Sequence, residues 1–365
     1  MDKLPVEIVL NILCSIDDVD ALKAATRTCR YLHSTFTSYK NTIIAQVLLH
    51  HISWDVFPEA ILVYKSSRFQ TLGPGFNLQQ LEDFSSKFLS RRMTSPSQNT
   101  FQDLEEAPPL IRVHEIVKFL AENIADTAWN THLDHNEDDR CRPKPSSRDI
   151  YKIQRALYRF QLFWNTVGNW PVELTLPAMY DVFFRFFSNW ENEQLACVRH
   201  HLAAIIDNSP CFQDAVLSHN AWYTRRDDMP ESLLSRGLEY VYWIATSESS
   251  AEAHELTLDA LRSPWGGTIL SDQNNRRTVR KSLSVRFFRS NAGPILGKRF
   301  KELSDDEISG LMENPYCHEN NCSDMIAKFG RAYDLAYERI PIRQPNGRLR
   351  DTIFYLSEGY AFWDR

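Results

Sequence analysis

Residues 149–164 read DIYKIQRALYRFQLFW, and the spacing of their apolar side chains predicts an amphipathic α-helix. Steps of three and four residues separate the members of this series, as one face of a helix requires. The series comprises Ile150, Ile153, Leu157, Phe160 and Trp164. A half-buried strand would instead alternate strictly between apolar and polar residues. This stretch therefore indicates a helical fold.

The same periodicity recurs along most of the chain, and alternating strand patterns are scarce. Further helical runs begin at Pro5, Asn41, Leu78, Ile111, Leu176, Glu191, Glu231, Glu252 and Cys322. The run near Glu231 continues one apolar face through Leu234, Leu238, Val241 and Ala245. We therefore expect an all-α (mainly α) protein, with a three-helix unit at its N-terminal end followed by a larger, irregular helical domain.

The composition agrees with bulky helices and argues against nucleotide-dependent chemistry. Glycine is scarce: 12 of 365 residues are glycine, or about 3%, whereas glycine makes up about 7% of the residues of an average protein. No Gly-rich phosphate-binding motif is present. The net charge of −6 gives no general attraction for nucleic acid or for an anionic membrane. We expect no cofactor.

The seven cysteines are sparse and mostly lie within apolar runs, which is typical of free thiols in a reducing compartment. The first residues lack the basic and apolar regions of a signal peptide. A membrane span needs a run of about 18 uncharged apolar residues, and no such run occurs in the sequence. We therefore expect a soluble protein of the cytoplasm or the nucleus that is not secreted.

Two polar stretches, 95–109 and 130–147, interrupt the helical pattern. The second reads NTHLDHNEDDRCRPKPSS, contains little to bury, and predicts a flexible loop or linker. These breaks divide the chain into an N-terminal unit over residues 1–48, a helical segment over 49–129, the loop over 130–147, and a helical domain over 148–365.

The segment from Pro5 to Ile16 reads PVEIVLNILCSI and is unusually apolar. Its polar residues Glu7, Asn11 and Ser15 lie four apart, so they form one narrow stripe on a helix. A helix that is apolar over the rest of its circumference must be covered on nearly all sides. A unit of about 40 residues cannot provide that cover alone. Either the rest of the chain or a partner protein must do so.

Two more short helices are expected directly after this segment. Asp20 is placed to cap the first of them. Cys29, Leu32 and Phe36 fall at spacings of three and four and line one face of the second. The sequence therefore predicts a small bundle of three helices.

The spacing of these residues resembles an F-box over roughly residues 3–45. The matching residues are Leu4, Pro5, Glu7, Ile8, Ile12, Leu13, Leu22, Cys29, Arg30, Leu32 and Phe36. In F-box proteins this small helical bundle docks on the Skp adaptor of a cullin-based ubiquitin ligase. The resemblance implies that the residues that face the adaptor, or support that face, are Leu4, Pro5, Ile8, Ile12, Leu13, Leu22, Cys29 and Leu32. Two departures are Thr28, where the family usually has an apolar residue, and Leu32, where many members have Trp.

The residues 149–160 and 236–240 also resemble helices that are common in fungal F-box proteins. The resemblance implies that the helical remainder binds a protein target. The first hypothesis is therefore the substrate-recognition subunit of an SCF-type E3 ubiquitin ligase, which acts in ubiquitin-dependent protein degradation and carries no catalytic residues. The alternative is a helical scaffold or interaction protein that acts outside ubiquitin ligation. A cysteine-based enzyme is a third hypothesis.

Two groups of residues are candidates for a site, one for binding a metal and one for nucleophilic catalysis. Cys317, His318 and Cys322 lie close together, but a structural zinc site needs four ligands and at most three are local. Cys197 and His201 share one helix face and would pair as nucleophile and base, yet the run around them is that of a core helix. We expect no metal site and no catalytic residue in either group.

One basic stretch lies between Asp272 and Glu302, where no acidic residue occurs. It holds nine arginines and lysines, and arginine suits carboxylate and phosphate groups. The candidates for binding an acidic or phosphorylated target segment are Arg276, Arg277, Arg280 and Lys281. The alternative is a solvated loop whose charge is balanced elsewhere in the fold. Nucleic acid is a weaker candidate, because no aromatic-lined groove motif accompanies the charges.

Overall fold

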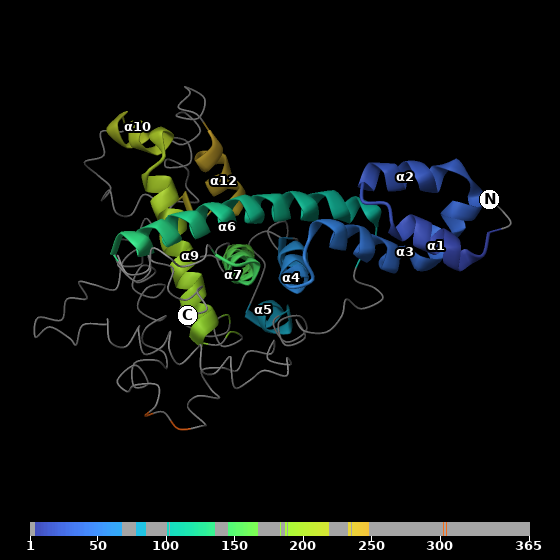
Figure 1. Ribbon diagram of the computed structural model, residues 1–365, viewed down its shortest axis with the longest axis horizontal. Helices are drawn as coiled ribbons and strands as arrows, with labels where there is room; N and C mark the ends of the chain where they lie inside the picture. The colour runs from blue at the N-terminus through green and yellow to red at the C-terminus, as the bar shows by residue number, and fades with distance from the viewer. Residues whose placement is uncertain are drawn as a thin grey trace, which may run out of the picture.

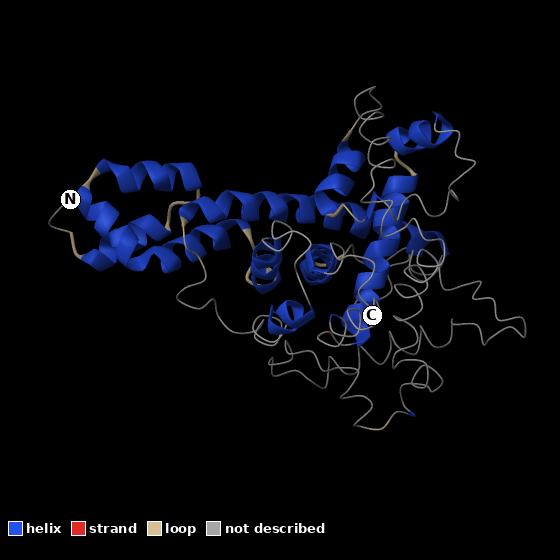
Figure 2. Cartoon of the chain, turned by 180° about the vertical axis from the view of Figure 1, so that it is seen from behind, coloured by secondary structure: helices blue, strands red, loops and turns tan. Residues whose placement is uncertain are grey.

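The computed structural model describes residues 4–67, 78–84, 101, 103–135, 145–166, 183, 187, 189–218, 233–234, 236–247, 302 and 304. Of these residues 86% are helical and none lies in a strand, as Figure 2 shows. The prediction of a mainly α protein is therefore confirmed for the described part of the chain. Within the same ranges, no helix combines the length and the apolar character that crossing a bilayer needs.

Three helices form a unit at the N-terminal end of the molecule (Figure 1). They are α1 (Val6–Cys14), α2 (Val19–Thr28) and α3 (Arg30–His51). Pro5 immediately precedes α1 and occupies its N-cap position. Helices α1 and α2 both pack on α3.

The cap of α2 differs from the expected one. The carboxylate of Asp18, not that of Asp20, accepts hydrogen bonds from the backbone N–H groups of Asp20 and Ala21, at 3.1 and 3.3 Å. Asp18 has extended backbone angles (φ −95°, ψ 127°), which an N-cap residue requires, whereas Asp20 already lies inside the helix. The helix therefore begins two residues earlier than the prediction assumed.

Helix α3 is long and bent. The Sγ atom of Cys29 caps it by accepting a hydrogen bond from the Leu32 N–H at 3.5 Å. Tyr39 has non-helical angles (φ −119°, ψ 22°) and divides the helix into two halves. The separate helix expected from Asn41 is thus the second half of α3, and it continues to His51, past the boundary predicted at residue 48.

The remaining described elements include one long helix, α6. They are α4 (Phe57–Ser67), α5 (Leu78–Phe84), the short 3-10 turn η3 (Leu104–Glu106), α6 (Ala107–His135), α7 (Ser147–Thr166), α9 (Asn189–Asp207), α10 (Pro210–Ser218) and α12 (Leu238–Thr246). Helix α6 runs from the N-terminal unit to the region of α9, α10 and α12, with α4 and α7 on one side of it (Figure 1). It packs against α3, α4, α7, α9 and α12.

Helix α7 is the centre of the larger core. It packs against α4, α6 and α9. The apolar face predicted from its sequence is buried at Ile153, Leu157, Phe160 and Trp164. Because α4 and α7 pack together, the predicted segment 49–129 and the described part of 148–365 share one core.

Two expected boundaries are wrong. Helix α6 continues to His135, so the helical structure reaches several residues into the loop expected from Asn130. The helix expected to run through Leu234 and Leu238 is interrupted, because α12 begins only after Gly237, which has a φ of 88°. The helical runs expected at Leu176, Glu252 and Cys322 lie outside the described residues.

Candidate partner-binding face on α1

Helix α1 buries one side and exposes apolar residues on the other. Val9 and Leu13 are 1% and 0% exposed and pack in the core of the N-terminal unit. Leu4, Ile8 and Ile12 are instead 39%, 45% and 42% exposed. Ile8 and Ile12 lie one turn apart on the same face of α1, and Leu4 lies just before the helix, which begins at Val6. We call these three exposed residues the α1 stripe.

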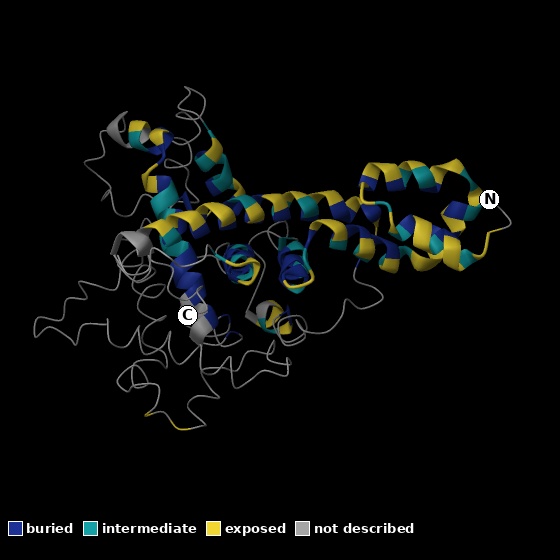
Figure 3. Cartoon of the chain, viewed as in Figure 1, coloured by how far each residue is buried: buried dark blue, intermediate teal, exposed yellow. Residues whose placement is uncertain are grey.

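The α1 stripe is unusual because its three exposed apolar side chains come from one short segment, residues 4–12. Five large apolar side chains of the described residues are exposed, and the two outside the stripe are Tyr39 and Trp54. Singly exposed apolar residues are common on protein surfaces, whereas a contiguous group marks a site of interaction. Figure 3 shows exposed residues along α1, in the unit that projects from one end of the molecule. The described part of the chain therefore leaves this face uncovered.

Contacts at both ends of α1 hold the stripe in place. The Tyr31 hydroxyl of α3 donates a hydrogen bond to the Leu4 carbonyl at 2.7 Å. At the other end, Nε2 of His50 lies 3.0 Å from the Cys14 carbonyl oxygen. Burial raises the pKa of the Cys14 thiol, which therefore stays protonated at neutral pH. A surface fixed at both ends by one supporting helix loses little conformational entropy when a partner covers it.

The structure separates the eight residues that the F-box resemblance implies into two groups. Exposed on the surface are Leu4, Pro5, Ile8 and Ile12. Within the unit, Leu13, Leu22 and Leu32 are buried and Cys29, the N-cap of α3, is half-buried. Only the first group is placed to touch a partner, and the second supports the helices that present it.

The residues considered for chemistry form no site in the described part of the chain. Cys197 and His201 are both buried in the core side of α9, as the core interpretation predicts. No group of three or more potential metal ligands occurs among the described residues. The candidates Cys317, His318 and Cys322 lie outside them. So does the basic group of Arg276, Arg277, Arg280 and Lys281.

Sequence reasoning missed a buried ionic cluster around Arg159 of α7. Its Nη2 atom lies 2.7 Å from Oε1 of Glu191 and 3.3 Å from Oε1 of Glu59. Its Nη1 atom donates to Oε1 of Gln194 at 3.3 Å, and its guanidinium lies 5.5 Å from the centre of the Phe187 ring. The cluster joins α4, α7 and α9. The only signal in the sequence was an arginine between bulky apolar neighbours.

A second buried polar contact joins α6 to α7. A hydrogen bond of 2.8 Å links Nδ1 of His114 to the hydroxyl of Tyr158. Burial, then the charges of Lys118 and His51, lower the pKa of His114 to about 4. Burial, and then the nearby Glu59, raise the pKa of Tyr158 well above its usual value. Both rings are therefore uncharged at neutral pH, as buried groups with a single polar partner should be.

Comparisons with protein-family models, with curated proteins and with solved structures found no match to this chain. The α1 stripe is the feature of the described structure that bears most directly on function. It offers an apolar docking face, and neither the buried cluster nor the buried pair offers a reactive group to solvent.

Proposed function

We propose that this protein is the substrate-recognition subunit of an SCF-type E3 ubiquitin ligase, and that the α1 stripe docks on a Skp adaptor that connects it to a cullin. The observation that carries the proposal is the exposure of Ile8 and Ile12 one turn apart on α1, with Leu4 and Pro5 exposed just before the helix. These four are among the residues that the F-box resemblance assigns to the adaptor or to the support of its face. The buried residues of the motif fit the supporting role.

The energetics of docking favour the stripe as the anchor. Full burial of a leucine or isoleucine side chain contributes about 1.5–3 kcal/mol. The three side chains of the stripe are roughly 40% exposed, so covering them contributes about 1 kcal/mol each. Such centrally placed apolar groups dominate the binding energy of many interfaces, while the rim contributes little.

In this role the chain performs no bond chemistry. It holds the adaptor through α1 and a target protein through the helical remainder. Tethering a target beside the ubiquitin-loaded enzyme raises its effective concentration there, which accelerates transfer without any new catalytic group. The result is ubiquitin-dependent degradation of the target.

The test is a titration of the full chain with a purified Skp adaptor, followed by calorimetry. We expect a complex of one chain with one adaptor. The double variant Ile8→Ala, Ile12→Ala removes apolar area from the stripe and is expected to weaken binding by about 2 kcal/mol, or roughly thirtyfold. Both residues are exposed, so the thermal unfolding midpoint should change little.

The matched control is Trp54→Ala, which removes a large exposed apolar side chain outside the stripe. It should leave adaptor affinity unchanged. A wild-type chain that does not retain the adaptor would contradict the proposal and favour a scaffold outside ubiquitin ligation. Equal losses in the stripe variant and in Trp54→Ala would contradict the assignment of the stripe.

A further inference from the structure

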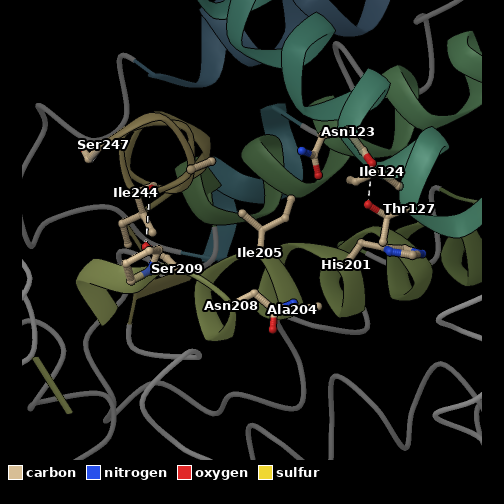
Figure 4. Close-up of a pocket in the computed structure, with 12 residues that line it drawn as sticks. Asn123, Ile124, Thr127, His201, Ala204, Ile205, Asn208, Ser209, Ile244 and Ser247 are labelled. Atoms are coloured by element: carbon tan, nitrogen blue, oxygen red, sulfur yellow. Dashed lines mark hydrogen bonds between the residues drawn. The ribbon is translucent and has the colours of Figure 1, made fainter. Parts of the chain in front are cut away.

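A pocket opens near the end of α6 that is remote from the N-terminal unit (Figures 1 and 4). Its walls come from α6, α9, α12 and the start of α10, and its volume is about 260 Å³. The labelled side chains in Figure 4 come from these elements. The pocket thus lies between helices that the sequence separates by more than a hundred residues, since Asn123 and Ser247 both line it.

The described lining of the pocket holds one ionisable side chain, the imidazole of His201. No Asp, Glu, Lys or Arg occurs among the described residues that line it. Three isoleucines, Ile124, Ile205 and Ile244, supply apolar surface, and Asn123 and Asn208 bring carboxamide groups. A basic ligand would lose hydration here without gaining a counter-charge, and an acidic ligand would find only the buried imidazole of His201. The pocket therefore favours an uncharged ligand that has both an apolar part and a polar end.

The hydrogen-bonding groups favour a ligand that both donates and accepts. The Ser209 hydroxyl uses its hydrogen on the Ile244 carbonyl, at 3.4 Å, so its oxygen offers lone pairs. Helices α9 and α12 end at Asp207 and Thr246, next to lining residues. The C-terminal end of a helix carries partial negative charge, which attracts donors, whereas the N-terminal end of α10 at Pro210 carries partial positive charge, which attracts acceptors. A primary amide supplies such donors, and its carbonyl can accept from a carboxamide in return.

The volume limits the size of the occupant. A cavity of about 150 Å³ is large enough for benzene. By the same measure this pocket holds about ten non-hydrogen atoms, which corresponds to one amino-acid residue of medium size. A nucleotide or a haem group is too large. The occupant is therefore a single side chain or a molecule of similar size.

We propose that this pocket binds a side chain with a primary amide, a glutamine or an asparagine, presented by the target protein. This assignment of a target chemistry rests on the proposed function. Between them, the described lining without Asp, Glu, Lys or Arg, the acceptor oxygen of Ser209, the helix ends of both polarities and the volume favour this class over acidic, basic and purely apolar side chains.

The test measures the binding of four small probes to the full chain by nuclear magnetic resonance titration. The probes are the N-acetyl methylamides of glutamine, leucine, glutamate and lysine, which share one backbone and differ in the side chain. We expect the glutamine probe to bind at least fivefold more tightly than each of the others. Equal affinity for glutamine and leucine, or a preference for a charged probe, would overturn the proposal.

Two variants locate the binding. Ala204→Leu places extra volume in the pocket and should weaken the glutamine probe at least fivefold. Ala203→Leu is the matched control, because Ala203 is also half-buried on α9 but does not line the pocket. Thermal melting confirms that both variants fold. An equal loss in both variants, or a loss in neither, would overturn the assignment to this pocket.

The adaptor titration separates this proposal from the proposed function. Ala204→Leu should retain the Skp adaptor as well as the wild type does. A chain that selects the glutamine probe but does not retain the adaptor would overturn the proposed function and support the chemistry of the pocket. A chain that retains the adaptor but shows no selection among the probes would overturn the pocket alone.

Discussion

Arg159 is the largest of the fully buried side chains among the described residues. Its guanidinium stands between the carboxylates of Glu59 and Glu191, which come from two other helices. Burying charges costs several kcal/mol for each ion, and this cost is offset only when the charges meet in good geometry. The cluster is therefore sensitive to the loss of one member, more than to its replacement as a whole.

Replacing this guanidinium should destabilise the fold strongly. Arg159→Met keeps the length of the side chain but leaves the two buried carboxylates without the cation between them. We expect a loss of about 3–5 kcal/mol in the free energy of unfolding, measured by urea denaturation. Arg112→Met is the control, because Arg112 pairs with Glu239 at the exposed surface and should cost less than about 1 kcal/mol. Similar losses in both variants would contradict the argument.

The buried contact between His114 and Tyr158 predicts a dependence of stability on pH. The folded pKa of His114 is about 4, below its ordinary value of 6.5. Between these values the unfolded chain binds a proton that the folded chain does not, so stability falls as the pH decreases from 6.5 to 4. The full loss is about 3 kcal/mol. Urea denaturation of the wild type at several pH values measures it.

The control variants for this prediction are His114→Gln and His33→Gln. The first removes the buried imidazole, so it should reduce the pH dependence of stability in this window and leave the part due to His200, whose pKa is also lowered by burial and then by Arg199. The second changes an exposed histidine of α3 and should leave the dependence as it is in the wild type. A steep dependence that survives in His114→Gln would show that another group causes it.

At the scale of elements, the start of α12 depends on a glycine and on a side chain from α7. Gly237 has φ 88° and ψ −178°, a region that is open to glycine and strained for other residues. A Cβ atom there would lie 2.7 Å from Oε1 of Gln161. That same oxygen accepts a hydrogen bond from the Leu238 N–H at 2.7 Å, which satisfies the first turn of α12.

Gly237→Ala should therefore destabilise the protein by about 2–4 kcal/mol, from backbone strain of about 1–3 kcal/mol and a lost hydrogen bond of about 1 kcal/mol. A double-mutant cycle with Gln161→Ala separates the two contributions. In the Gln161→Ala background the glycine substitution should cost only the strain. Fully additive losses in the urea denaturation of the four proteins would contradict the contact between Gln161 and position 237.

The same elements show what the sequence could and could not predict. The spacing from Ile150 to Trp164 predicted α7 well, because its apolar face is wide and regular. The break at Gly237 was missed, because the apolar spacing continues across it and periodicity does not report a backbone dihedral angle. The cap at Asp18 was missed because Asp20 suits the same role by composition.

The candidate site was predictable only in part. The apolar circumference of the Pro5–Ile16 segment indicated that the three-helix unit could not cover it alone, and the exposed stripe on α1 agrees with that. Which of its residues stay exposed depends on how α1 packs on α3, which spacing does not report. The pocket and the Arg159 cluster were not predictable, because each brings together residues far apart in the chain.

At the scale of the whole molecule, α3 belongs to two parts of the structure. Its first half packs in the N-terminal unit, and its second half carries Ile43, Ile44, Val47 and Leu48, all fully buried. Helix α3 also packs on α6, and an ion pair of 2.9 Å joins Lys23 of α2 to Glu105 of η3. The N-terminal unit and the larger core should therefore unfold together.

Ile44→Ala tests this cooperativity. A buried isoleucine reduced to alanine should cost about 2–5 kcal/mol. If the molecule unfolds as one unit, hydrogen exchange measured by mass spectrometry should accelerate in α1 and in α7 to the same extent. Acceleration confined to α1, α2 and α3 would show that the N-terminal unit opens independently. The exposed substitution Tyr39→Ala provides a comparison with little expected effect on either helix.

Helix α6 has 29 residues and is therefore about 43 Å long. It connects the unit that carries the α1 stripe to the helices that form the pocket, so its length fixes the separation between these two surfaces. The length of such a helix hardly changes, because its rise per residue is fixed, but the helix can tilt as a rigid rod. A rotation of about 5° at one end moves the other end by roughly 4 Å. Because α3 also packs on α6, a change in the bend at Tyr39 would shift the α1 stripe relative to the pocket.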